Sequence, residues 1–149
     1  DYKFATERSQ HLMSLGIPLN TDSTLKGQTV FLAERCGELM HDNIITDRTI
    51  LDVMAFTLNA KSIPHQDKDA FETYASEFIR EYDYIFYISP HGLKIEDNGV
   101  RETDEHYRDL IDFTITTLIK RHGHKAGKIE KISGSTEERI QQILNITSL

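Results

Sequence analysis

The sequence predicts an α/β protein whose strands form a parallel sheet. Strand-like and helix-like segments alternate along the whole chain. The segment 84–88 is β-branched and aromatic without apolar–polar alternation, which is typical of a parallel strand covered on both faces. Polar clusters directly follow three of the expected strands. Functional groups of α/β proteins gather at the carboxyl ends of parallel strands, so these clusters are the first candidates for a site.

Residues 2–6 are expected to form a short strand, and the polar segment that follows, through Ser14, a helix or loop ending at the Gly16-Ile17-Pro18 break. A polar loop is expected from Asn20 to Gly27. In residues 28–40, apolar side chains recur with a period nearer 3.6 than 2, which predicts a helix.

Residues 43–46 are predicted to form a short apolar strand that leads through a charged turn into a helix over 50–59. After a break at Pro64, residues 69–81 place Phe71, Tyr74 and Phe78 on one face and are expected to form an amphipathic helix.

The second half continues the alternation. After the strand at 84–88 and a polar loop, residues 104–121 carry apolar side chains at helical spacing, and His122-Gly123 is expected to end that helix. Residues 129–132 predict a last strand, which turns into a helix over 137–144.

Length and composition narrow the class of protein. The 149 residues suit a single domain, which we expect to span 1–149. The 38% hydrophobic and 28% charged residues exclude a disordered chain. A net charge of −7 disfavours a nucleic-acid partner without excluding a local basic site. The lone Cys36 and the lack of any long apolar run favour a cytoplasmic protein with no membrane partner.

Two kinds of enzyme find little support in the motifs. The seven histidines lack metal-ligand spacing, so a histidine-based metal site is not expected. No G-x-S-x-G motif is present, and Cys36 lies within a predicted helix without a paired base. Acyl transfer through a serine or cysteine nucleophile is therefore disfavoured.

The polar clusters at the strand ends combine acids with arginines. An acid at a strand end can hold Mg²⁺ or accept a proton, and a neighbouring guanidinium can bind a phosphate or carboxylate through two hydrogen bonds. The alternative for Asp47 is a helix N-cap before Ile50, and for Arg48 a solvated charge. The three clusters are Glu7-Arg8, Asp47-Arg48-Thr49 and Gly134-Ser135-Thr136.

A second pair of arginines, Arg101 and Arg108, lies in and after the polar loop at 97–101. Arginines on such a segment can stabilise charge on a transferring phosphoryl group. The alternative is that Arg101 and its acidic neighbours belong to a solvated helix start.

Taken together, these segments resemble the P-loop kinase family, in the branch that contains the nicotinamide riboside kinase domains of bifunctional NAD-salvage proteins and related AAA-type ATP-binding domains. The resemblance implies a P-loop NTPase fold, a nucleoside/nucleotide kinase-like three-layer sandwich with a parallel sheet. The matching segments are Thr6-Glu7-Arg8, residues 28–38, Ile44 to Thr49, Tyr84 to Ser89, Asp97-x-Gly99-x-Arg101, Ile132 to Ser135, and Glu138-Arg139.

The resemblance implies ATP and Mg²⁺ as cofactors and transfer of the γ-phosphate to a nucleoside or nucleotide, of nicotinamide riboside or deoxynucleoside monophosphate type. On the acceptor side it makes Glu7 the catalytic carboxylate facing the acceptor hydroxyl. Arg8 and Gln28 would contact the acceptor, and Arg48 a phosphate group. Asp47 would be the catalytic acid on the magnesium side.

On the ATP side, the resemblance makes residues 91–108 a lid. Arg101, as a catalytic residue, and Arg108 would close over the β- and γ-phosphates. Gly134, Ser135 and Thr136 would lie against the adenine ring.

One departure from the family is large, because the chain contains no G-x-x-x-x-G-K-[ST]. By the resemblance, the sequence begins where the second strand is expected, so the first strand and the P-loop are missing from it. We expect the native protein to carry roughly 20–35 further N-terminal residues, the length of a strand–loop–helix unit. Without that central strand the sheet would consist of two halves with unpaired inner edges.

Other functions stay open beside this one. The chain could be a catalytically silent nucleotide-binding or regulatory domain, a hydrolase that uses water as the acceptor, or a kinase acting on a modified base in DNA. A monomer and a homodimer are both compatible with the sequence.

Overall fold

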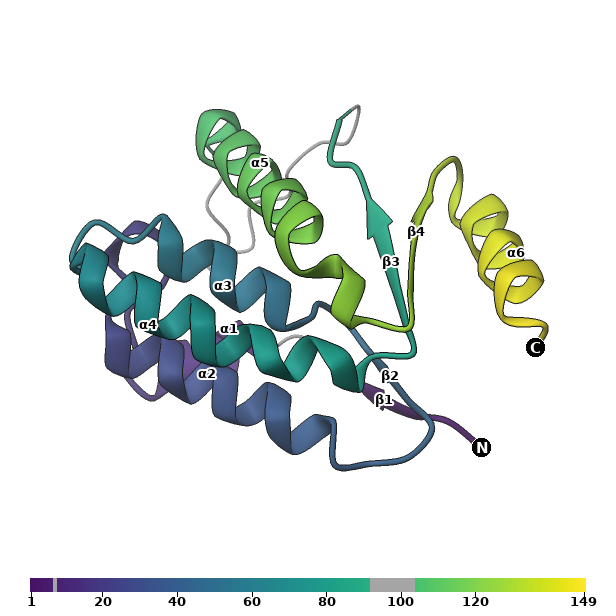
Figure 1. Ribbon diagram of the computed structural model, residues 1–149, viewed down its shortest axis with the longest axis horizontal. Coiled ribbons are helices and arrows are strands. Elements are labelled where there is room, and N and C mark those ends of the chain that lie inside the picture. The colour runs from purple at the N-terminus through teal and green to yellow at the C-terminus, as the bar shows by residue number, and fades with distance from the viewer. Residues whose placement is uncertain (7, 92–103) are drawn as a thin grey trace.

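The computed structural model describes residues 1–6, 8–91 and 104–149, along which helices and strands alternate (Figure 1). This alternation confirms the predicted α/β class. Short 3₁₀ turns lie at Asn20–Asp22, Ser76–Glu81 and Gly123–Lys125. The strands are β1 (Lys3–Ala5), β2 (Ile44–Thr46), β3 (Tyr84–Ile88) and β4 (Lys128–Ile132), and the α-helices are α1 (Ser9–Ser14), α2 (Leu25–Glu38), α3 (Ile50–Leu58), α4 (His65–Ala75), α5 (Glu105–His122) and α6 (Thr136–Thr147).

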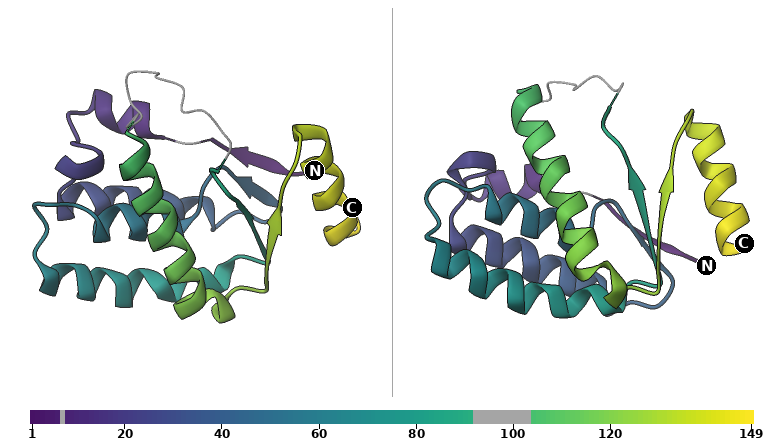
Figure 2. Two further views of the ribbon diagram at one scale, coloured as in Figure 1. Left: turned by 90° about the horizontal axis from the view of Figure 1, so that it is seen from above. Right: turned by 45° about the horizontal axis from the view of Figure 1, so that its top comes forward.

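The strands form two parallel pairs. β1 pairs with β2, with Phe4 opposite Ile45, and β3 pairs with β4, with Phe86 opposite Glu130. Parallel pairing is therefore confirmed, but among the described residues no ladder of hydrogen bonds joins the two pairs into one sheet. The pairs lie beside each other with β2 and β3 innermost (Figures 1 and 2). Each inner strand thus has one edge without a partner strand in the described part of the chain.

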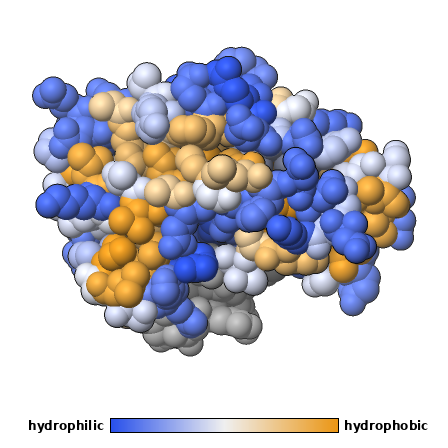
Figure 3. Space-filling view, turned by 90° about the horizontal axis from the view of Figure 1, so that it is seen from below, coloured by the Kyte–Doolittle hydropathy of each residue, from blue (hydrophilic) through white to orange (hydrophobic). Residues whose placement is uncertain are grey.

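The strands lie between two unequal helical layers (Figures 1 and 2). Helices α1 to α5 form one layer, and α6 stands alone on the opposite side, next to β4. The Lys3 ammonium donates a hydrogen bond to the ring of His41, which follows α2, so Lys3 faces the large helical layer. Because side chains alternate along a strand, Phe4 and its partner Ile45 face the other way, and they are 77% and 43% exposed. Helix α6 also exposes apolar side chains, with Ile140 52% and Leu144 39% exposed, and apolar surface is visible at the right-hand end of Figure 3.

Helix α3 is the centre of the core. It is apolar around most of its circumference, as expected of a helix surrounded by others, and α2, α4 and α5 pack against it. Its buried apolar residues are Ile50, Leu51, Val53, Met54 and Ala55, and Thr57 is buried as well. Within the described ranges, no helix combines the length and apolar composition needed to cross a membrane.

Two helix starts differ from the prediction because their caps precede the apolar pattern. Helix α2 begins at Leu25, inside the loop expected over 20–27, because the Thr24 hydroxyl accepts a hydrogen bond from Gly27 N–H at 3.1 Å. Helix α4 begins at His65 instead of residue 69, directly after Pro64, whose fixed φ suits a helix entry. It ends at Ala75 and continues as a 3₁₀ turn.

The expectation that the strand at 84–88 is covered on both faces is half wrong. Ile85 is buried against the core, whereas Tyr84 and Ile88 are each 41% exposed. The reason is the uneven layering, since among the described elements only α6 lies on the second face of the β3–β4 pair. A continuous apolar run therefore indicates a strand that other elements can cover on both faces. In the described part of this chain, one face of the strand is buried and the other is partly exposed.

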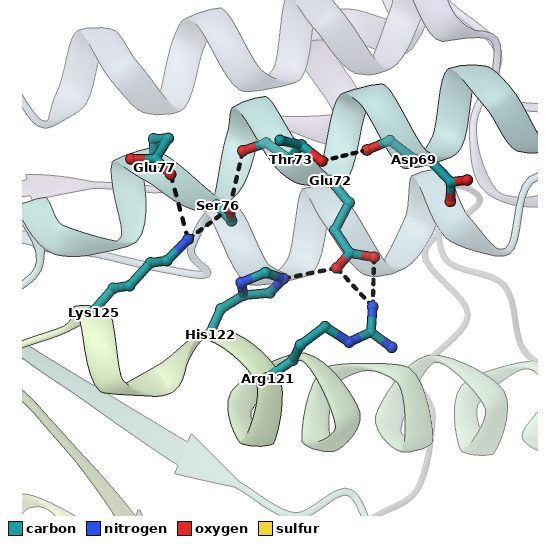
Figure 4. A network of polar contacts seen from close by, with 8 residues as sticks. All are labelled: Asp69, Glu72, Thr73, Ser76, Glu77, Arg121, His122 and Lys125. Carbon is teal, nitrogen blue, oxygen red and sulfur yellow. Dashed lines mark hydrogen bonds and ion pairs between the residues drawn. The ribbon is translucent and has the colours of Figure 1, made fainter.

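A polar network joins α4 to the end of α5 (Figure 4). Glu72 accepts hydrogen bonds from Arg121 at 2.6 and 2.7 Å and from the His122 ring at 2.7 Å. Just after α4, at the start of the 3₁₀ turn, the Ser76 hydroxyl accepts a hydrogen bond from Lys125 at 2.9 Å. Although burial alone would raise it, these bonds to Arg121 and His122 lower the pKa of the Glu72 carboxyl.

We expect Glu72→Gln to lower the free energy of unfolding by about 1 kcal/mol at neutral pH, because Glu72 is shielded while Arg121 is half exposed. A lowered carboxyl pKa stabilises the fold above the unfolded-state pKa, and this stabilisation is lost as the pH falls through the folded-state pKa. Urea titrations of both proteins at several pH values should therefore converge in acid. Asp69→Asn, at an exposed position one turn earlier on α4, is the matched control. A gap between wild type and Glu72→Gln that stays constant down to low pH would contradict the role of the carboxylate charge.

Candidate functional site

The carboxyl ends of β1 and β2 bring two of the predicted clusters together. Asp47 N–H donates a hydrogen bond to the Ala5 carbonyl at 2.9 Å, which extends the β1–β2 ladder beyond the strands. The segment after Ala5, with Arg8, therefore leaves the sheet next to Asp47 and Arg48. Glu7 lies outside the described residues.

The β1 side of this site is tied to α2. The Arg8 guanidinium forms an ion pair with Glu34 at 3.2 Å, with both side chains partly exposed. Gln28, in the first turns of α2, is 3% exposed and so belongs to the interior more than to the surface. Both predicted acceptor-binding residues are thus associated with α2, and Arg8 is the one at the surface.

Asp47 is exposed, and it is not the cap of the helix that follows. Thr49 is the N-cap of α3, in a capping box in which its N–H donates to the Asp52 carboxylate at 2.8 Å and its hydroxyl accepts from Leu51 N–H at 3.1 Å. The alternative interpretation of Asp47 as a helix cap is therefore wrong. Its carboxylate is left at the surface, at the carboxyl end of β2.

Arg48 adopts a backbone conformation that is unusual for its residue type. Its φ is +73°, in the left-handed region, which costs a residue with a Cβ about 1–2 kcal/mol. The Thr46 hydroxyl supports the turn by donating to the Arg48 carbonyl at 2.8 Å. The guanidinium lies over the ring of Phe56 at 5.6 Å from its centre, and Phe56 packs in turn against Tyr107 at 6.4 Å between ring centres.

The start of α5 lies close to this site through Tyr107. Asp104 caps the helix by accepting from His106 N–H at 2.9 Å, and Arg108 follows in its first turns. The Arg108 side chain is only 21% exposed and lies 3.7 Å from Asp109. Arg101 and most of the predicted lid over 91–108 lie outside the described residues.

The third predicted cluster, Gly134-Ser135-Thr136, lies at the carboxyl end of the β3–β4 pair. Gly134 has a φ of +96°, and Ser135 caps α6 in a capping box with Glu138. Together with Ser89 and Arg139, Gly134 lines a surface depression of about 230 Å³ between the carboxyl ends of β3 and β4. Thr136 begins α6, and its hydroxyl accepts a hydrogen bond from Arg139 at 3.1 Å.

A polar contact not anticipated from the sequence joins β3 to α5. The Tyr87 hydroxyl donates to Asp112 at 2.5 Å, and the exposed His91 ring lies 3.9 Å from the other oxygen of Asp112. Burial, followed by the bond to Asp112, raises the pKa of Tyr87 to about 12. The phenol is therefore neutral and a hydrogen-bond donor at physiological pH. Residues 87 and 112 belong to different predicted elements, so no spacing rule connects them.

Asp47 is the predicted site residue best suited to a metal. An exposed carboxylate at a strand end fits Mg²⁺, which usually takes one or two carboxylates and completes its shell with water and substrate phosphates. In the ranges that the structure describes, no three His, Cys, Asp or Glu side chains gather into a cluster that could hold a metal without such additional ligands.

Comparison of the chain with protein-family models, with curated proteins and with solved structures finds no match in any of the three.

Proposed function

We propose that this protein is an ATP- and Mg²⁺-dependent phosphotransferase that moves the γ-phosphoryl group of ATP to a nucleoside or nucleotide acceptor. The observation that carries the proposal is that Asp47 and Arg48 follow each other at the carboxyl end of a parallel strand, next to the segment that contains Arg8. A metal-binding acid beside a phosphate-binding guanidinium is the combination that phosphoryl transfer requires.

In this proposal the acceptor oxygen attacks the γ-phosphorus, the bond to the β,γ-bridging oxygen breaks, and ADP leaves. Asp47 would hold the Mg²⁺ that accompanies ATP, and that ion would supply neutralisation of phosphate charge. Arg8 and Arg48 bind the acceptor, and Gln28, which is buried in α2, has a structural role instead of contacting it. Glu7 takes or orients the proton of the acceptor hydroxyl. Catalysis then consists mostly of positioning and charge stabilisation.

On the donor side, Arg101 and Arg108 would close over the β- and γ-phosphates. Arg108 lies in the first turns of α5, and the preceding residue, Tyr107, packs against Phe56, whose ring also contacts Arg48. The segment Gly134–Thr136 and its depression would hold the adenine ring. Backbone groups of such a turn can approach a flat base closely, because Gly134 has no side chain.

The activity also needs a phosphate-binding loop, and the 149 residues contain none of the usual form. In the described part of the chain the inner edges of β2 and β3 have no partner strand, which supports a further parallel strand between them, because a sheet interior does not leave such edges open and two-stranded sheets are marginal alone. The proposal includes this strand and its loop as part of the native protein.

The test is a transfer assay on the protein at the length its gene encodes, with γ-labelled ATP and Mg²⁺. The acceptors are nicotinamide riboside, the four deoxynucleoside monophosphates and a duplex with a hydroxymethylated base. We expect label in one of the small acceptors. Release of phosphate without any acceptor would indicate a hydrolase instead. Label in the duplex would indicate a DNA kinase, and nucleotide binding without turnover a silent domain; any of these three results overturns the proposal.

A further inference from the structure

The outer edge of β1 has no partner strand in the described part of the chain. β1 pairs with β2 on one side and is the outermost strand on the other (Figure 2). Lys3 N–H donates to the Asn43 carbonyl at 2.8 Å, and the Ala5 carbonyl accepts from the segment after β2, so both residues direct their backbone groups towards β2. Neighbouring residues of a strand direct these groups to opposite edges, so the N–H and C=O of Phe4 face the open edge and can pair with another strand.

A depression of about 320 Å³ lies along this strand, between β1 and the end of α2. Residues of β1 line one side, and Gly37, Glu38 and His41, at and after the end of α2, line the other. All three residues of β1 take part, Phe4 included, so the depression borders the open edge. A strand added to that edge would therefore place the side chains of one of its faces at the depression.

Basic side chains outnumber acidic ones in the lining of this depression. Lys3 uses one of its three N–H donors on the His41 ring, at 3.1 Å. Arg8 is partly exposed, although a carboxylate of α2 lies 3.2 Å from it. Among the described lining residues Glu38 is the one acid, and the buried Arg35 balances its charge at 2.9 Å. In a chain with a net charge of −7, this surface favours a negatively charged ligand.

Gly37 lines the same depression, and the fold itself does not require a glycine there. The residue is helical, its φ lies outside the left-handed region, and a Cβ added to it would meet nothing within 4 Å. Alanine would fit and would favour the helix more. A glycine that lowers stability without a steric reason is explained by a ligand that approaches the backbone closely. This observation points to a ligand independently of the charges.

We propose that an extended acidic segment of a partner protein adds to the outer edge of β1 as a further strand. Its backbone pairs with Phe4, and its side chains alternate between the two faces of the strand. Side chains on one face enter the depression and contact Lys3 and His41, so acidic residues belong there. Side chains on the other face lie next to the exposed Phe4 ring, so apolar residues belong in between. An edge of backbone N–H and C=O groups pairs with a peptide and not with a nucleic acid, which favours a protein partner.

The experiment selects binders from a displayed library of random octapeptides, with the protein at the length its gene encodes as the target. We expect enrichment of peptides with acidic residues at alternate positions and apolar residues between them. The most enriched peptide is then synthesised, and its Kd is measured by fluorescence anisotropy. Methylation of the alternate backbone nitrogens that face β1 should weaken binding about 10-fold or more, because it removes the N–H donors. Methylation of the other alternate set is the matched control and should have little effect.

Substitutions in the protein test the depression. Lys3→Glu reverses a charge in the lining and should weaken binding of the peptide about 10-fold. Lys26→Glu, at an exposed position at the start of α2, makes the same charge change elsewhere and should leave the Kd within about twofold. Gly37→Leu should weaken binding about 10- to 100-fold, because its side chain fills the depression. Gly37→Ala should weaken binding less while the helix becomes more stable, so its loss of binding cannot come from unfolding.

The inference is overturned if the library yields no binder, or only binders without acidic residues. It is also overturned if Lys3→Glu and Gly37→Leu leave the Kd unchanged, or if both methylated peptides bind alike. Displacement of the peptide by an equal concentration of inorganic phosphate would indicate a small-anion site, and displacement by a single-stranded oligonucleotide a nucleic-acid site. Dimerisation that Lys3→Glu abolishes would indicate a second copy of this chain. Each of these three results overturns the inference, and none of the outcomes depends on whether the proposed phosphoryl transfer is observed.

Discussion

In the proposed phosphotransferase, replacing Asp47 with asparagine should lower phosphoryl transfer by a factor on the order of 10²–10³ and leave the fold intact. The carboxylate is exposed, and the hydrogen bond that fixes its place in the chain comes from its backbone N–H to Ala5. The Asp47→Asn variant would therefore keep the ladder but could not neutralise a metal ion. The effect should fall mainly on kcat, because the metal matters most as charge develops in the transition state.

The measurement is the initial rate against Mg²⁺ concentration, with circular dichroism to confirm the fold. Asp42→Asn is the matched control, since Asp42 is also exposed and lies five residues earlier, in the turn before β2. A rate for Asp47→Asn within a few fold of the wild type would remove Asp47 from the metal site. Partial recovery at high Mg²⁺ would agree with weakened metal binding.

The largest effect on stability is expected at Gly127, where a single methyl group meets the backbone. A Cβ built there would overlap the Asp83 carbonyl oxygen and lie 3.1 Å from the carbonyl carbon. The same glycine donates its N–H to Tyr82 at 2.9 Å, which starts the β3–β4 ladder. Gly127→Ala must therefore open this ladder at its first rung, and we expect a loss of about 3 kcal/mol in the free energy of unfolding.

Gly37 provides the comparison, because a Cβ there meets nothing within 4 Å and its backbone is helical. Gly37→Ala should raise stability by about 0.5–1 kcal/mol, since alanine restricts the unfolded chain. Denaturant titrations of the two variants should move the midpoint in opposite directions. Equal shifts for both would mean that Gly127 is not tightly packed against Asp83.

The elements that could be predicted from sequence are those whose signal is local. The strand at 84–88 and the helix start at Ile50 come directly from apolar runs and their flanking polar residues. The starts of α2 and α4 were missed because Thr24 and Pro64 act before the apolar pattern begins. Coverage of β3 on its second face was overestimated, since burial depends on which elements surround a strand and not on its own composition.

Part of the candidate site could also be predicted from local sequence signals, and part of it depends on the tertiary structure. The neighbourhood of Arg8 and Asp47 follows from the rule that parallel strands end at one edge, and a sequence is enough to apply it. The contact of Arg48 with Phe56 could not be foreseen, because it depends on the tertiary structure and because an arginine rarely adopts the left-handed conformation that Arg48 has. The bond between Tyr87 and Asp112 joins residues of β3 and α5 that are 25 positions apart, and only the tertiary structure brings them together.

The hydrogen bond from Ile50 N–H to the Tyr82 hydroxyl connects the start of α3, next to Arg48, with the segment before β3. The Tyr82 side chain is buried, and burial raises the pKa of its phenol well above its usual range, so the ring stays neutral at physiological pH. Tyr82 lies two residues before the start of β3, and Ile50 opens α3 two residues after Arg48. A shift of the β3–β4 pair would therefore pull on the first turn of α3, and the guanidinium of Arg48 would move with it.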